Sequence, residues 1–173
     1  MSRGYFQKFQ IKDVVFLAIM SAVALATCAV MPLVISLQPL IFGISQLVTA
    51  LQIGVFFAIG LYKVRKPGSL LLMALMMGLI QLMMSPPMFL SSVLNGVLIE
   101  LIVLLLFRGY EKDGAVFVAA MLHTPLSLPF NYLYNRLIKG ADSPLAAVAD
   151  RAPLATVGMT LAVVAVSALG ALI

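Results

Sequence analysis

The chain has 173 residues, of which 63% are hydrophobic and 10% are charged, and its 11 Lys and Arg residues outnumber its 6 Asp and Glu residues. Apolar stretches occupy almost all of it, and each needs about 20 residues to cross a hydrocarbon core. That leaves no room for a soluble catalytic or nucleotide-binding domain. The basic residues flank the apolar stretches and form no stripe with aromatic residues, which argues against nucleic acid as a partner. The single cysteine, Cys28, excludes an internal disulfide and a cysteine metal cluster.

The hydrophobic pattern predicts an all-α integral membrane protein in which residues 1–173 form one domain of six transmembrane helices. In chain order, the predicted spans are Ile11–Leu33, Leu40–Leu61, Ser69–Met84, Met88–Phe107, Gly114–Ile138, and a sixth from Leu145 or Ala152 to Ile173. The third span is short for a full crossing, because Ser85-Pro86-Pro87 ends it and the residue before a proline disfavours helical geometry.

The distribution of positive charge predicts how these spans are oriented. Eight Lys and Arg residues fall on one side of the predicted membrane, namely Arg3, Lys8, Lys12, Lys63, Arg65, Lys66, Arg108 and Lys112. The three on the other side are Arg136, Lys139 and Arg151. The positive-inside rule then places both termini in the cytoplasm. An even number of spans also requires the two termini to share a side.

The first span carries Ala18, Ala22 and Ala26 at a strict four-residue spacing. Residues four apart lie on one face of a helix, so these methyl groups form a narrow smooth strip. Small side chains let another helix backbone approach closely in lipid. The strip is therefore either an internal packing face or a docking face for a different membrane protein, and its start near the cytoplasmic leaflet favours docking.

Six short spans, internal termini and this alanine strip resemble the substrate-binding S component of an energy-coupling factor (ECF) transporter, an ABC-type importer. The turn Val64-Arg65-Lys66-Pro67-Gly68 and the stretch from Leu94 to Glu100 also resemble the thiamine-related YkoE branch. The resemblance implies a multi-pass protein of a prokaryotic plasma membrane that takes up a vitamin-like nutrient. Its implied partners are a transmembrane coupling protein, which the alanine strip would contact, and two ATP-binding subunits.

Polar residues within the fifth predicted span recur every four residues, at His123, Ser127, Asn131 and Asn135. Polar groups inside a membrane usually face the bundle interior or a cavity. The stripe runs from mid-membrane to the outer surface, where Tyr132 and Tyr134 also lie, and the resemblance places substrate in this outer half. The same residues would otherwise serve as interfacial anchors or as partners for carbonyls freed by Pro125 and Pro129.

Further candidates for the substrate site lie on other segments. Ser91, Ser92 and Asn95 occupy the outer half of the fourth span, while Gln38 and Arg151 lie in predicted outer loops. Arg151 would suit an anionic group of the ligand, or an ordinary surface salt bridge. Glu100 lies deeper, at a depth comparable with that of His123, so a buried pair between these two side chains is a further expectation.

The remaining features separate the competing functions. His123 is the only histidine and makes a poor metal site alone, although a single histidine with one of the many methionines could ligate haem. Haem or a metal is therefore the alternative substrate, and no cofactor is expected. The chain has no Gly-x-Ser-x-Gly, His-Glu-x-x-His or Gly-x-x-x-x-Gly-Lys motif, so we expect no enzyme activity. A small channel is the other alternative. A channel needs a polar lining through both leaflets, whereas the polar residues here are concentrated in the outer halves of the predicted spans.

Overall fold

A computed structural model describes residues 8–28, 34, 37, 40–140 and 143–173 of the chain. Within these residues the fold is entirely helical, which confirms the predicted class. The helices are α1 (Ile11–Thr27), α3 (Ile44–Lys63), α4 (Ser69–Leu82), α5 (Pro86–Phe107), α6 (Asp113–Ile138), α7 (Pro144–Arg151) and α8 (Pro153–Leu172).

Four of these helices, α3, α5, α6 and α8, are long and apolar enough to cross a membrane. Helix α4 is apolar but has 14 residues, and α1 has 17. The described part of the first predicted span ends as helix at Thr27, and residues 29–33 lie outside the described residues. The sixth predicted span divides into α7 and α8 at Ala152, because the residue before Pro153 is driven out of helical geometry.

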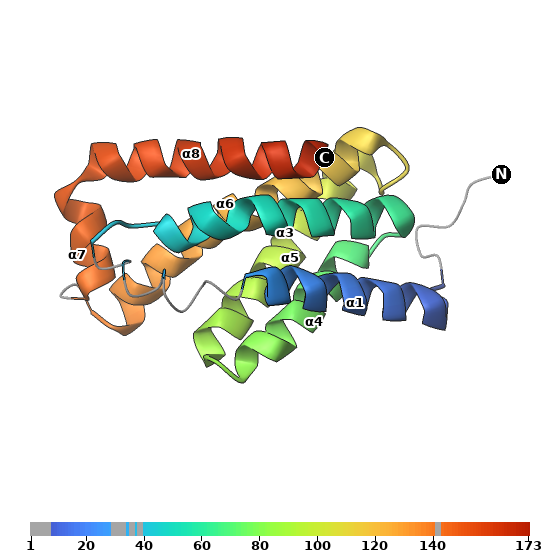
Figure 1. The fold of residues 1–173 in the computed structure, drawn as a ribbon, viewed down its shortest axis with the longest axis horizontal. Coiled ribbons are helices and arrows are strands. Elements are labelled where there is room, and N and C mark those ends of the chain that lie inside the picture. Colours follow the sequence, from blue (N-terminus) through green and yellow to red (C-terminus); the bar gives the residue numbers. More distant parts are fainter. Residues whose placement is uncertain (1–7, 29–33, 35–36, 38–39, 141–142) are drawn as a thin grey trace.

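The long helices run back and forth between two ends of one bundle (Figure 1). The start of α1 and the C-terminus lie at the same end, which we call the termini end. The turns 64–68 and 108–112 also lie there, whereas α7 lies at the opposite end, between the end of α6 and the start of α8. This arrangement places the starts of α3 and α5 and the end of α6 close together, opposite the termini end.

Small residues allow the helices to pack at short distances. A Cβ atom added to Gly170 of α8 would lie 2.5 Å from the Leu51 carbonyl oxygen of α3, and one added to Gly96 of α5 would lie 2.6 Å from the Ala74 Cβ of α4. Serine hydroxyls also join helices, because Ser21 of α1 donates to a carbonyl of α4 at 3.1 Å and Ser167 of α8 donates to a carbonyl of α6 at 2.8 Å. Both devices are typical of helix association in lipid.

The 64–68 turn between α3 and α4 ties several helices together at the termini end. The Lys66 ammonium lies 2.6 Å from the Asp13 carboxylate of α1, and the Arg65 guanidinium lies 2.6 Å from the Asp113 carboxylate of α6. Gly68 has a φ of 93°, a left-handed conformation that glycine adopts without steric cost, and its N–H points at Glu100 of α5. This turn therefore fixes the starts of α1, α4 and α6 relative to one another.

Candidate functional site

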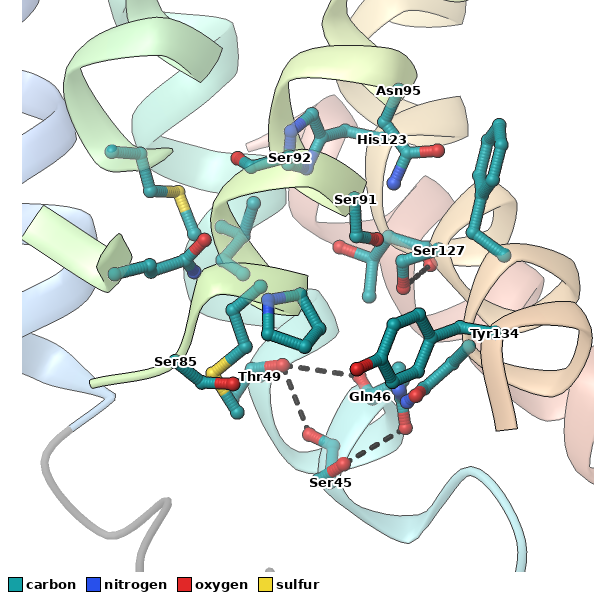
Figure 2. A pocket seen from close by; sticks show the side chains of 18 of the residues that line it. Ser45, Gln46, Thr49, Ser85, Ser91, Ser92, Asn95, His123, Ser127 and Tyr134 are labelled. Atoms are coloured by element: carbon teal, nitrogen blue, oxygen red, sulfur yellow. Dashed lines mark hydrogen bonds between the residues drawn. The ribbon is translucent and has the colours of Figure 1, made fainter. Parts of the chain in front are cut away.

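A cavity of about 460 Å³ lies between the helices (Figure 2). Its lining includes the starts of α3 and α5 and the end of α6, at the end of the bundle opposite the termini (Figure 1). Its volume falls in the range of small-molecule sites, about 300–1,000 Å³. Side chains from α1, α3, α4, α5 and α6 line it, together with Pro144 and Leu145 of α7. The structure brings seven of the sequence-predicted site residues into this lining, and they are Ser91, Ser92, Asn95, His123, Ser127, Asn131 and Asn135.

The base of the cavity is formed where α5 and α6 face each other, and it carries several buried polar atoms. Asn95, His123 and Thr124 are almost completely buried. The Asn95 Oδ1, both ring nitrogens of His123 and the Thr124 Oγ1 lack a hydrogen-bond partner among the described residues. The His123 ring packs on Phe57 of α3, with ring centroids 4.4 Å apart. Figure 2 shows Asn95 and His123 close together at one end of the cavity, far from Ser45 and Ser85.

Other polar side chains of the lining, at the base and nearer the mouth, make hydrogen bonds within the protein. The Ser92 hydroxyl donates to the Ala74 carbonyl at 3.2 Å, and the Ser127 hydroxyl donates to the Thr124 carbonyl at 2.6 Å. The Asn135 amide donates to the Asn131 carbonyl at 2.8 Å. Serine and asparagine commonly bond to the preceding helical turn in this way. The fully buried polar atoms of the lining that lack a partner among the described residues therefore all lie at the base.

Sequence reasoning missed the contribution of α3. Ser45, Gln46 and Thr49 line the cavity and form a small network, in which Ser45 donates to Gln46 Oε1 at 2.8 Å. These residues occupy adjacent helical turns in an otherwise apolar span, which was the signal that could have identified them. Gln81, Ser85, Thr124 and Lys139 also line the cavity. Gln81, Ser85 and Lys139 lie at or next to helix ends, and Thr124 follows the predicted site residue His123.

Three of the predicted site residues do not contribute to the lining that the structure describes. Tyr132 faces α7, where its hydroxyl donates to Asp150 at 2.7 Å and accepts from Arg136. One residue along a helix turns the side chain by about 100°, so Tyr132 cannot share the face of Asn131. Arg151 is exposed at the end of α7, and Gln38 lies outside the described residues.

The alanine strip lies on the outer surface of α1. Ala22 and Ala26 are exposed and Ala18 is half-buried, whereas the face that packs inward carries Leu17, Ser21 and Ala24. Internal packing therefore does not account for Ala22 and Ala26. The strip faces whatever surrounds the bundle, which is lipid or another protein.

Glu100 is held by hydrogen bonds, but not by His123 as the comparable depths suggested. Its carboxylate accepts from the Gly68 N–H at 2.6 Å, the Leu71 N–H at 3.4 Å and the Tyr110 hydroxyl at 2.9 Å. The two amides belong to the first turn of α4, where the helix dipole favours a negative charge. Burial and the nearby carboxylate raise the pKa of Tyr110 in the 108–112 turn, so its hydroxyl remains a donor. The comparable depths of Glu100 and His123 in the membrane do not determine which neighbouring helix each side chain faces.

The methionines do not form one cluster. Met77 and Met88 line the cavity, whereas Met83 and Met84 are exposed at the end of α4. Within the part of the chain that the structure describes, no three His, Cys, Asp or Glu residues gather as a metal site requires.

A model of a family described as "hypothetical bacterial integral membrane protein (Trep_Strep)" matches residues 11–173. The chain belongs to this family. It is accordingly a multi-pass integral membrane protein of bacterial type, in agreement with its long apolar helices. No curated protein and no solved structure matches the chain. The description of the Trep_Strep family names neither a substrate nor a partner, and it gives no support for the thiamine-related branch.

Proposed function

We propose that this protein is the substrate-capture component of an ECF-type importer. It would bind a small nutrient in the cavity and dock through Ala18, Ala22 and Ala26 onto a transmembrane coupling protein driven by two ATP-binding subunits. The observation that carries the proposal is the cavity itself, whose buried base presents polar atoms with no partner among the described residues. Such atoms are costly to bury unless a ligand or water satisfies them.

The charge distribution supports an outward-facing cavity. Lys63, Lys66, Arg108 and Lys112 lie at the termini end, which the positive-inside rule assigns to the cytoplasm. In the proposed topology, α1, α3, α4, α5, α6 and α8 are the six spans. The cavity, at the opposite end, would then open to the outside, where a nutrient is captured.

The apolar core between the cavity and the termini end supports capture over conduction. Phe57 lies against His123 at the base of the cavity. Nearer the termini end, Leu61, Met73 and Val103 are completely buried. A channel needs a continuous path for its ion through both leaflets. Here a packed layer closes the cavity, so release of the substrate to the cytoplasm requires a rearrangement, which docking on a partner would supply.

The proposal specifies the substrate only as a small nutrient and does not include thiamine. The resemblance to the thiamine-related branch rested on the 64–68 turn and on the stretch from Leu94 to Glu100, in which Asn95 lines the cavity. The turn and Glu100 have structural roles at the termini end, away from the cavity. They therefore carry no information about what the cavity holds.

The docking surface is tested by enlarging one alanine. We expect Ala22→Leu to abolish nutrient uptake in cells that contain the coupling complex, because the larger side chain keeps a partner helix from approaching. Since Ala22 is exposed and lies outside the cavity lining, ligand retention by the purified variant should be unchanged. Uptake of the co-purifying nutrient and its retention by the purified protein are measured side by side.

Ala165→Leu is the matched control, because Ala165 is an exposed alanine in the middle of α8. It should support normal uptake. Normal uptake by Ala22→Leu would contradict docking through the strip, and simultaneous loss of uptake and retention would show that the strip supports the fold instead.

A further inference from the structure

The base of the cavity specifies a pattern of hydrogen bonds that its ligand must complete. Asn95 is 1% exposed, Thr124 3% and His123 4%, so water has little access to them. Their unpartnered atoms have defined capacities: the Asn95 Oδ1 accepts, the Thr124 hydroxyl donates and accepts, and a neutral imidazole has one donor and one acceptor. A ligand that satisfies all three must therefore present at least one donor and one acceptor at its buried end.

The walls between the base and the mouth favour a flat molecule. Phe130 and Tyr134 lie four residues apart on α6, so they share one face of the helix, and both line the cavity. Aromatic faces stack on planar rings. Figure 2 shows the Tyr134 ring between the base residues and the Ser45 network, on the path that a ligand would occupy.

The charge of the lining selects against cations. Among the described residues that line the cavity, Lys139 is the only charged side chain, and none carries a carboxylate. Lys139 follows the end of α6, about 24 Å along the helix from His123 at a rise of about 1.5 Å per residue. A cationic ligand would meet no counter-charge at the base and a like charge at the mouth.

We propose that the ligand is a planar ring compound that is uncharged at its buried end, where it carries adjacent donor and acceptor groups such as the N–H and C=O of a cyclic amide. Any charge on it is negative and lies toward Lys139. Asn95, His123 and Thr124 form hydrogen bonds with the donor and acceptor groups at the buried end of the ligand. This inference rests on the proposed function, because it assigns the chemistry of the same cavity, and it excludes quaternary amines, metal ions and haem as the ligand.

The test uses the intact protein in lipid nanodiscs. The probe is the mixture of small molecules that passes a dialysis membrane from an extract of bacterial cells. Unbound molecules are removed by gel filtration, and those retained are identified by mass spectrometry in both ion modes. Asn95→Leu and Thr124→Val remove polar atoms from the base with little change of shape, and each should lower the retained amount about tenfold.

Ser69→Ala is the matched control. The Ser69 hydroxyl is also buried without a partner among the described residues, but it lies at the start of α4 and outside the cavity lining. This variant should retain as much ligand as the wild type. Gel-filtration profiles and circular dichroism verify that all the variants are folded, and Thr124→Val provides the test should Asn95→Leu fail to fold.

The outcomes separate this inference from the proposed function. A planar neutral or anionic amide that both base variants lose and Ser69→Ala keeps is the expected result. Retention of a cation, a metal ion or haem, or equal retention by folded base variants, overturns the assignment of the ligand and leaves substrate capture standing. If the wild-type protein retains nothing, substrate capture itself is overturned.

Discussion

Two groups of buried polar side chains differ in whether their hydrogen bonds are made within the protein. The Glu100 carboxylate accepts three, from Gly68, Leu71 and Tyr110, and thereby joins α5 to the start of α4. Asn95 and His123, farther from the termini end, have atoms without partners among the described residues. A satisfied buried group stabilises the fold, whereas an unsatisfied one lowers stability until a ligand or water binds. The first group is structural, and the second is available for function.

Replacing Glu100 by glutamine tests the structural role. An amide has the shape of the carboxylate but only one accepting oxygen, so either orientation places its NH₂ against the N–H of Gly68 or of Leu71. We expect Glu100→Gln to destabilise the protein by about 1.5–3 kcal/mol and Tyr110→Phe by about 1 kcal/mol. The double variant should cost less than the sum, because both changes alter the same hydrogen bond between Tyr110 and residue 100.

Melting temperatures of the purified variants in one detergent give the order of stability. Glu100→Gln melting with the wild type would mean that the carboxylate does not accept these bonds in the folded protein. Because Glu100 lies outside the cavity lining, retention of ligand below the melting temperature should be unaffected.

Helical spacing predicted the residues of the cavity as long as they shared one helix face. His123, Ser127, Asn131 and Asn135 all line the cavity, as the four-residue period indicated. Spacing does not show which neighbour a face meets, and the sequence therefore did not identify Gly68 and Tyr110 as the partners of Glu100 or α7 as the partner of Tyr132. Polar residues on adjacent turns marked the start of α3 as unusual, but whether that part of α3 borders the cavity depends on helix packing, which no local pattern encodes.

At the scale of whole helices, glycines set how closely α3 and α8 approach. Gly170 faces the backbone of Leu51, and a Cβ added to Gly54 would lie 3.0 Å from the Ser167 carbonyl oxygen. Helix α3 also carries Ser45, Gln46 and Thr49 of the cavity, so its position against α8 affects the site. The apolar pattern predicted both helices, but it gave no indication that they pack against each other.

Gly170→Ala should force these two helices apart. The added methyl group would lie 2.5 Å from the Leu51 carbonyl oxygen, which is backbone and cannot move without its helix. Overpacking of this kind costs about 1–3 kcal/mol, so the melting temperature in detergent should fall. Gly158→Ala on the same helix is the control, because nothing lies within 4 Å of the added Cβ. It should leave stability unchanged or raise it by up to about 1 kcal/mol, since alanine favours helix. Equal effects of the two changes would contradict the close approach.

At the scale of the whole molecule, both the proposed function and the ligand assignment depend on which end of the bundle faces outward. The sequence predicted that the two termini share a side, and Figure 1 shows the start of α1 and the C-terminus at one end. The cavity could not be predicted in the same way, because five helices and α7 contribute to it from segments far apart in the chain. The structure relates the cavity to the charge pattern, because the cavity lies at the end of the bundle opposite the basic 64–68 turn.

Single cysteines introduced at the two ends decide the orientation. In a Cys28→Ala background, Lys112→Cys places a thiol at the start of α6 and Arg151→Cys places one at the end of α7, both at exposed positions. A membrane-impermeant maleimide should label Arg151→Cys in intact cells and Lys112→Cys only after the cells are opened, because the basic end stays in the cytoplasm. Equal labelling in opened cells shows that both thiols react. The reverse pattern would direct the cavity into the cytoplasm, where it could not capture a nutrient from outside, and the alanine strip would then need a different partner.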